Sequence, residues 1–393
     1  MEIQRAKKKI KISDDLITCR PISVQIPSDL IPELLKELPV KTLARFMSVS
    51  KDFGSIIRNR DFMKLYLRKS SSRPQSLIFT IEGKESGKHF FFSLLQSQDQ
   101  GESSSPVVTY LMNCRALPYT TIAPSVHGLV CHGLPSGLIV SNPSTRRSIT
   151  LPKIDTRSIS MYHHLGYDPI SGDYKVLCMV KGKHGGWGRH LANELRVLTL
   201  GKGNFWRMVE DFPPHCLCTH ETPDICINGV LYYVALLDTA VSHAVMSFDV
   251  RTEKFHLIEG PDPNVRPKVT RYEGKPALLF AGIADCRLNL WVLEDAAKHE
   301  WSKMSYVSTT VACDAHFFHH IFCANDAGEI VMAPESVCSS KPFEVLYYHP
   351  RKKTMRSVLV EGFSERKVPF WDKDPCHNII SVFSGQLDNL MFL

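Results

Sequence analysis

The 393-residue sequence lacks any apolar run long enough to cross a bilayer. Its longest apolar stretches, residues 230–237 and 276–284, fall short of the roughly 20 residues that a membrane-spanning helix needs. The first 20 residues begin with charged side chains and contain no apolar core followed by small residues, so we expect no secretory signal. Without such a signal a reducing compartment is expected, in which the twelve scattered cysteines stay free thiols.

The large C-terminal part also lacks net charge. Residues 1–69 carry 15 Lys/Arg and 8 Asp/Glu, and this excess equals the whole net charge of +7, so residues 70–393 are balanced at 32 of each sign. A balanced surface has no net field that attracts nucleic acid or an anionic membrane, and we expect neither as a partner. The basic cluster Lys7-Lys8-Lys9 lies in residues 1–22, which we interpret as a disordered tail, with a nuclear import signal as the alternative. Cytoplasmic and nuclear locations both stay open.

Motifs of common catalytic and nucleotide-binding sites are missing as well. The sequence contains no Gly-x-Ser-x-Gly elbow and no His-Glu-x-x-His pair. It therefore gives no motif that would support a serine nucleophile or a zinc hydrolase. The glycine-rich segment 181–188 lacks the Gly-Lys-Ser/Thr ending of a phosphate loop. His215, Cys216, Cys218 and His220 are zinc ligands by type, but they stand closer together than two separated pairs, and a surface loop explains them better. We expect no catalytic residue, no metal and no cofactor.

What the sequence does contain is a strong helical pattern in residues 26–66. Apolar residues between 30 and 38 recur at i, i+1, i+4, i+5 and i+8, which predicts one helix with a wide apolar stripe, capped by Asp29 and ended by Pro39. A second helix is predicted around residues 43–49 and a third around residues 53–57. About forty residues cannot enclose so much apolar surface, so the helices must cover either a partner protein or the rest of the chain.

This pattern resembles an F-box, the module that docks a substrate receptor onto the Skp-type adaptor of a cullin-based ubiquitin ligase. The resemblance rests on Pro27, Asp29-Leu30-Ile31, Leu34-Leu35, Leu38-Pro39-Val40-Lys41, Leu43, Arg45-Phe46 and Val49-Ser50-Lys51. Ile26 and Phe53 stand where the family often has Leu and Trp, and both remain apolar. The resemblance implies that a Skp-type adaptor, and through it a cullin ligase, binds this chain.

The adaptor-binding residues that the resemblance implies are Ile26, Pro27, Leu30, Ile31, Leu34, Leu35, Leu38, Pro39, Val40, Leu43, Phe46, Val49 and Phe53. In the isolated chain we expect the portion from Leu30 to Val40 to be exposed to solvent, as the face that the adaptor covers.

Beyond residue 75, short strands and turns repeat as a unit. Each unit contains an apolar strand, a polar turn and a second strand, and most units are preceded by a glycine between apolar residues, such as Gly128 or Gly229. Such units at a step near fifty residues predict four-stranded blades, and therefore a β-propeller-like domain of about six or seven blades. An irregular β-sandwich is the alternative. The strand centres expected to be buried in successive blades lie 57, 51, 44 and 53 residues apart: Val140, Val197, Phe248, Val292 and Val345.

This half resembles the F-box-associated, kelch-like domain of plant F-box proteins. The resemblance lies in residues 126–131 (VHGLVC), 139–146 (IVSNPSTR), 165–176 (LGYDP with DYKV) and 227–232 (INGVLY). The expected fold is α plus all-β, in four parts: the tail 1–22, a short three-helix F-box at 23–68, a hinge at 69–74 and the propeller-like domain at 75–393.

The function that the two resemblances imply is a non-enzymatic substrate receptor, which bridges the adaptor to a target protein for ubiquitination. A propeller enzyme or sugar-binding module with a helical cap is the alternative, and clustered carboxylates in a central pocket would favour it. The longest connections, 182–193, 211–224 and 262–272, are the expected target-binding loops. Trp187, in the first of them, is the aromatic side chain that we expect to contact a target.

Overall fold

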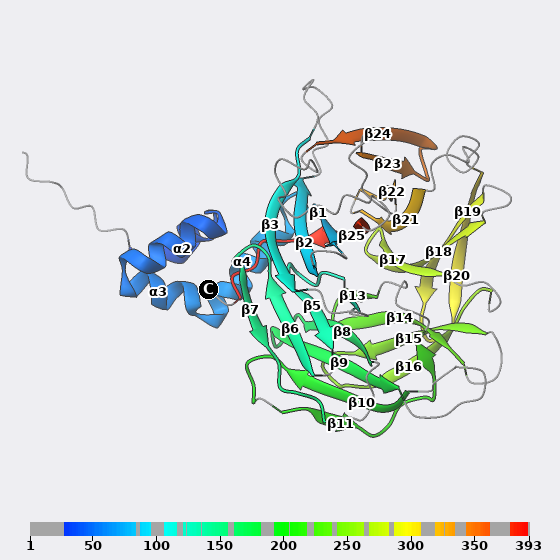
Figure 1. Cartoon of the computed structure of the whole chain (residues 1–393), viewed down its shortest axis with the longest axis horizontal. Helices are drawn as coiled ribbons and strands as arrows, with labels where there is room; N and C mark the ends of the chain where they lie inside the picture. Colours follow the sequence, from blue (N-terminus) through cyan, green and yellow to red (C-terminus); the bar gives the residue numbers. More distant parts are fainter. Residues whose placement is uncertain are drawn as a thin grey trace, which may run out of the picture.

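Helices occupy the N-terminal part of the chain and strands the remainder, and Figure 1 shows the sheets arranged in a ring with the helices to one side. The structure is a computed structural model. It describes residues 27–83, 87–95, 106–115, 121–122, 124–134, 136–155, 161–181, 192–203, 205–217, 224–237, 242–262, 267–282, 287–307, 319–325, 327–334, 343–361 and 378–391.

Three helices form where the sequence predicts them: α1 (Leu30–Leu35), α2 (Val40–Val49) and α3 (Lys51–Arg58). The first is shorter than predicted because the chain tightens before Pro39. The N–H groups of Glu37 and Leu38 donate to carbonyls only three residues back, at 3.2 and 3.1 Å, and a proline keeps the residue before it out of the helical region.

A fourth helix, α4 (Arg60–Ser71), was not predicted. Asn59 starts it, since its side-chain oxygen accepts hydrogen bonds from the N–H groups of Asp61 and Phe62 at 2.7 and 3.4 Å. The helix continues through Ser71, so the first half of the segment predicted as a hinge is helical. Because α4 has no internal proline or glycine, nothing in its sequence ends it earlier.

The strands form six antiparallel sheets, which we number as blades. Blade 1 contains β25 (Asn378–Gln386), β1 (Ser76–Gly83), β2 (Lys88–Leu95) and β3 (Thr109–Arg115). Blade 2 contains β4 (Thr121–Ile122), β5 (Val130–Leu134), β6 (Gly137–Asn142) and β7 (Arg147–Thr150). Blade 3 contains β8 (Met161–Asp168), β9 (Asp173–Lys181), β10 (Ala192–Thr199) and β11 (Arg207–Val209).

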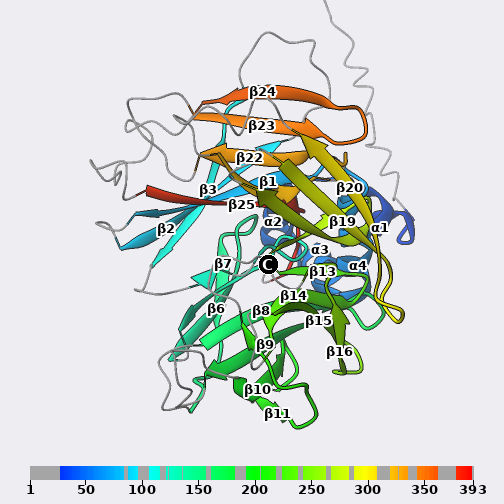
Figure 2. The ribbon, with the colours of Figure 1, turned by 90° about the vertical axis from the view of Figure 1, so that its right-hand side faces the viewer.

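Blade 4 has a fifth strand and contains β12 (Cys216–Leu217), β13 (Ile225–Ile227), β14 (Val230–Leu236), β15 (His243–Asp249) and β16 (Phe255–Glu259). Blade 5 contains β17 (Lys268–Tyr272), β18 (Lys275–Gly282), β19 (Arg287–Asp295) and β20 (Glu300–Val307). Blade 6 contains β21 (His319–Ala324), β22 (Ile330–Pro334), β23 (Phe343–His349) and β24 (Thr354–Val360). When the ring is viewed from the side, β23 and β24 of blade 6 lie at one edge, and β10 and β11 of blade 3 lie at the opposite edge (Figure 2).

The ring closes through a blade shared by both ends of the β domain. Strand β25 pairs antiparallel with β1, so that Phe79 stands opposite Val382 and Ile81 opposite Ile380. Three strands of blade 1 therefore come from the beginning of the domain and one from its end, which removes the free edges that an open ring would leave. The prediction of a propeller is confirmed, with six blades.

The predicted strand centres confirm the repeat. All five are almost fully buried, and each lies in the next-to-last strand of its blade, in five successive blades. These residues are Val140 in β6, Val197 in β10, Phe248 in β15, Val292 in β19 and Val345 in β23.

Glycine turns connect the inner strands of several blades, as the sequence predicts. In blade 4, Ile227 pairs with Val230 across a two-residue turn in which Asn228 and Gly229 have φ of 50° and 87°. Positive φ at both positions defines a type I′ turn, whose twist matches that of the flanking strands. A glycine is favoured at the second position because a side chain would strain this backbone.

Tryptophan side chains link the outer parts of neighbouring blades. The indole N–H of Trp206 in blade 3 donates to the Pro152 carbonyl after blade 2, at 2.9 Å. Trp301 in blade 5 donates to the Glu259 carbonyl of blade 4 at the same distance. Both rings are half-buried and pack against blade cores, so these two residues stabilise the ring.

Buried histidines line the contacts between blades 1, 2 and 3. Burial lowers the pKa of His89 in β2 to about 4. Burial, reinforced by the nearby His89 and His163, lowers the pKa of His132 in β5 to about 3. Both side chains are therefore neutral in the folded protein at neutral pH, because a charge there would lose its hydration.

We expect the free energy of unfolding to fall as the pH is lowered from 7.5 to 5. The folded-state pKa values of His89 and His132 lie below the value of about 6.5 in the unfolded chain, so the stability they contribute is complete above that pH and is lost below it. At pH 5 the loss should be about 2 kcal/mol for each histidine. Urea unfolding at the two pH values measures the loss, and His132→Gln should reduce the difference by about 2 kcal/mol. Equal stability at pH 7.5 and pH 5 would contradict the prediction.

Candidate adaptor-binding surface

The helices that carry the predicted site stand away from the blades. In Figure 1, α2 and α3 lie to the left of the ring, and α4 lies between them and blades 1 and 2. Of the helical residues, Leu67 of α4 belongs to the apolar cluster of blades 2 and 3. The faces of α1, α2 and α3 that point away from this contact are open to a partner.

Three large apolar side chains of these helices are exposed. Leu30 and Leu34 on α1 are 48% and 54% exposed, and Val49 at the end of α2 is 81% exposed. Leu30 and Leu34 are four residues apart and therefore lie on one side of their helix. Pro27 and Pro39, at the two ends of this region, are exposed as well. Such a group of exposed apolar residues on a small helical module is typical of a protein-binding surface.

The expected exposure of Leu35 and Val40 is wrong. Both are only 4% exposed, and Leu43, another predicted contact, is fully buried. They form the core of the helical module together with Ile57 and Tyr66. The physical reason is the added α4, whose apolar side chains cover the inner half of the stripe on α1 and α2 and leave only its outer half for a partner.

The remaining predicted contacts lie at the edge between core and surface. Ile31, Leu38, Phe46 and Phe53 are half-buried and pack against the core of the module. The rings of Phe46 and Phe53 meet edge to face with centroids 5.2 Å apart, which fixes α2 against α3. Ile26 lies outside the described residues.

Basic side chains surround this surface. Lys41, Arg45 and Lys51 are exposed, and none of them forms an ion pair with a described residue. Among the acidic residues, Glu37 is bound by Lys69 at 3.0 Å and by Arg73 at 3.8 Å, whereas Asp29 and Asp52 are exposed and form no ion pair with a described residue. The open charge next to the apolar surface is therefore mixed, with three cations and two carboxylates among these residues, and it favours a partner whose charges complement both signs.

The predicted target-binding residue cannot be placed, since Trp187 lies outside the described residues. His215, of the possible zinc cluster, is fully buried: its ring nitrogens face the Tyr233 hydroxyl at 3.0 Å and the Pro213 carbonyl at 2.6 Å. Cys218 and His220 lie outside the described residues. Within the described part, no group of three or more possible ligands could hold a metal.

A small cavity opens among the inner strands of the ring. Its lining includes His127, Asp224, Thr270, Arg271 and Ser384. Asp224 is the one carboxylate among the described lining residues, and it is bound to His164 at 2.8 Å. The clustered carboxylates that would favour a propeller enzyme are therefore not present in the described part of this cavity.

A helical module with an exposed apolar surface is joined to a six-bladed propeller, which is the architecture expected of an F-box protein with a propeller domain. The family description "F-box domain" matches residues 24–65, and "F-box associated beta propeller domain" matches residues 76–387. This chain belongs to the F-box proteins that carry an F-box associated β-propeller domain.

Curated relatives agree with this assignment. F-box protein At2g21930 of Arabidopsis thaliana is 69% identical over 404 residues, which cover 100% of both chains. F-box protein DOR of the same plant is 38% identical over 366 residues, which cover 87% of this chain and 90% of its own. None of the helices in the described ranges has the length and hydropathy of a membrane span.

Proposed function

We propose that this chain is the substrate-recognition subunit of a Skp–cullin–F-box ubiquitin ligase. The F-box binds a Skp-type adaptor, the adaptor connects it to the cullin, and the propeller holds a target protein for ubiquitination. The observation that supports this most is the exposure of Leu30, Leu34 and Val49 on helices whose own core is already filled. Exposed apolar side chains of this size gain free energy when a partner covers them.

The proposed adaptor contact consists of an apolar centre and a charged rim. The centre contains the exposed Leu30, Leu34 and Val49, with the prolines 27 and 39 and the half-buried residues around Phe46 and Phe53 at its border. Leu35, Val40 and Leu43 support this surface from below and do not touch the adaptor directly. The charged rim sets the orientation of the partner, while the apolar centre provides most of the affinity.

The propeller has the role of a target platform. We propose that target proteins bind its loops, with Trp187 as an anchor, and that ubiquitin transfer is carried out by partner subunits without a cofactor in this chain. Its location is cytoplasmic, nuclear or both, where such ligases meet their targets. The kelch-like character of the blades stays a prediction.

The test is reconstitution of the complex from the full chain and a purified Skp-type adaptor. We expect a one-to-one complex in size-exclusion chromatography, with a micromolar or lower dissociation constant in calorimetry. Addition of cullin, its RING subunit and a ubiquitin-conjugating enzyme should then produce ubiquitin chains on proteins that the propeller captures. Failure of the folded chain to bind any Skp-type adaptor would refute the proposed function.

A further inference from the structure

The C-terminal segment 387–391 lies between the F-box helices and the blades. Leu390 is 1% exposed and belongs to the core of the helical module, with Phe62 and Tyr66. Its neighbours Leu387 and Met391 pack instead in the apolar cluster of blades 2 and 3. Five residues that directly follow the ring-closing strand thus contribute side chains to the cores of both domains.

Asn389 fixes the backbone of this segment. Its side-chain N–H groups donate to the His127 carbonyl at 2.7 Å and to the Tyr174 hydroxyl at 2.8 Å. Its side-chain oxygen accepts from the Met391 N–H at 2.8 Å. Asn389 is buried, so each of these groups would be left without a partner if the side chain were removed.

Blade 2 holds the same segment from another side. The Asn142 side chain donates to the carbonyls of Asn389 and Met391, both at 2.9 Å. The Ser144 hydroxyl donates to the Asp388 carboxylate at 3.1 Å. The segment therefore has little freedom to move relative to blades 2 and 3.

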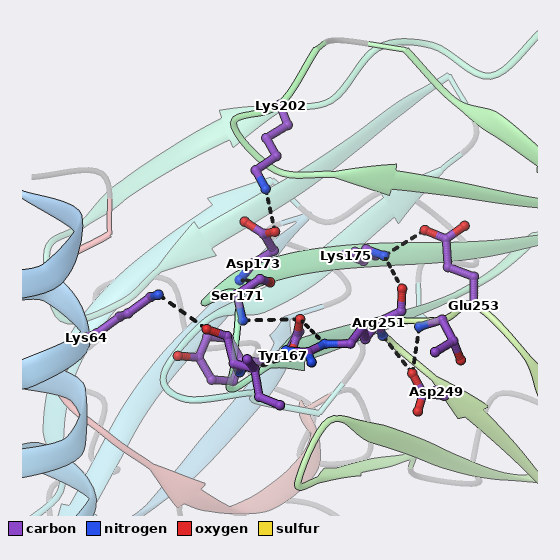
Figure 3. A network of polar contacts seen from close by, with 12 residues as sticks. Lys64, Tyr167, Ser171, Asp173, Lys175, Lys202, Asp249, Arg251 and Glu253 are labelled. Atoms are coloured by element: carbon purple, nitrogen blue, oxygen red, sulfur yellow. Dashed lines mark hydrogen bonds and ion pairs between the residues drawn. The ribbon is translucent and has the colours of Figure 1, made fainter.

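A second contact joins α4 directly to the turn between β8 and β9. Arg60 forms an ion pair with Asp173, and Asp173 also binds Lys202 at 2.6 Å. Lys64 of α4 donates to the Ile170 carbonyl at 3.4 Å, and Figure 3 shows Lys64 extending from the helix toward the turn. The turn approaches the helix so closely that a Cβ at Gly172, where φ is 75°, would lie 2.4 Å from the Lys64 side chain.

The charge on this turn is set by its surroundings. Burial raises the pKa of Asp173, but hydrogen bonds from Lys202 and Ser171 and the charge of Arg60 outweigh it and hold that pKa below its ordinary value. Asp168, at the other end of the turn, binds Arg251 of the β15–β16 turn at 3.2 Å. Ion pairs thus run from α4 through blade 3 to blade 4.

Three sequence motifs meet at this place. They are the segments 126–131, 139–146 and 165–176, which carried the resemblance to the F-box-associated domain. The first supplies the His127 carbonyl, the second supplies Asn142 and Ser144, and the third supplies Tyr174 and Asp173. The proposed role of the propeller loops does not explain these motif residues. They share a different role, which is to hold the F-box and the C-terminal segment.

We propose that the segment 387–391 and the β8–β9 turn form a positioning joint that holds the F-box at a fixed distance and orientation relative to the propeller. This purpose rests on the proposed function, since a ligase must present its target at a defined place relative to the adaptor. Domains of one chain move relative to each other unless a large or well-packed contact prevents it. Here Leu67 and Leu390 provide buried apolar contact, and Asn389 and Arg60 provide directional bonds.

The test measures the distance between the two domains in the full chain. Fluorophores on non-natural amino acids at the exposed positions Ser55 of α3 and Lys298 of the β19–β20 turn report that distance in single molecules. One variant is Asn389→Ala, and a second, Arg60→Ala with Lys64→Ala, removes only side chains at the surface of the joint. The matched control, Lys275→Ala with Arg351→Ala, removes two cations from exposed ion pairs elsewhere in the propeller.

We expect one narrow distance distribution for the wild type and the control, and a distribution about twice as broad in either joint variant. Thermal unfolding of the β-sheet signal verifies that each variant is folded, and if Asn389→Ala does not fold, the double variant decides. A broad distribution in the wild type, or an unchanged width in the folded variants, would overturn the proposal. The affinity for the adaptor is measured in parallel. A failure of the proposed function would appear as a loss of adaptor binding, whereas a failure of the positioning joint would appear in the distance distributions.

Discussion

Replacement of Leu30 and Leu34 by aspartate should abolish adaptor binding while the chain remains folded. Both side chains are about half exposed, so their loss removes little buried area from the isolated chain. In the complex, two carboxylates would have to be buried in an apolar contact, which costs several kcal/mol. We expect the affinity to fall at least about 100-fold, which corresponds to about 2.8 kcal/mol. Calorimetric titration of a Skp-type adaptor measures the effect.

Leu35→Ala is the matched control, because it changes the adjacent residue of the same helix. Leu35 belongs to the core of the module, so this change should cost about 2–5 kcal/mol of folding stability and affect binding only through it. Conversely, Leu30→Asp with Leu34→Asp should leave the melting temperature almost unchanged. If the aspartate variant binds the adaptor as tightly as the wild type, the adaptor contact lies elsewhere on the chain.

A chain that ends before Asn378 should fail to form a stable propeller. Without β25, strand β1 loses its inner partner, and the cluster of blades 1 and 6 loses Ile380 and Val382. Blade 1 could then no longer close the ring. The lost pairing and apolar burial should exceed about 5 kcal/mol, which is comparable to the whole stability of many domains. Circular dichroism and size-exclusion chromatography should show loss of cooperative unfolding, with aggregation.

A second variant, which is truncated less, separates the effect of ring closure from the effect of the positioning joint. A chain that ends at Gln386 keeps all of β25 but lacks the segment that contacts the F-box. It should therefore unfold cooperatively, although at a lower temperature, because Leu387 and the bonds of Asn389 are gone. A folded monomeric propeller in the chain without β25 would show that ring closure through this strand is not required.

Local patterns in the sequence determined most of the elements that form, with α4 as the exception. The apolar spacing of residues 30–57 gave α1, α2 and α3, and the fifty-residue repeat gave the blades with their five buried strand centres. Turn geometry could be anticipated too, since the backbone at Asn228 and Gly229 needs positive φ and thus favours glycine. Such features depend on neighbours within a few residues, and periodicity and turn chemistry report them directly.

Only the tertiary structure decided which side of each element is covered, and by what. Periodicity places Leu34 and Leu35 on the same wide stripe. In the folded chain, α4 and the distant Leu390 bury Leu35 and leave Leu34 exposed. Likewise, β25 pairs with β1 across some three hundred residues, and Asn389 binds Tyr174 across a separation of 215. A sequence pattern records that a residue is apolar or polar. It does not record which distant residue packs against that residue in the folded chain. In this protein, those long-range contacts decide which residues belong to the adaptor-binding surface and which belong to the core that supports this surface.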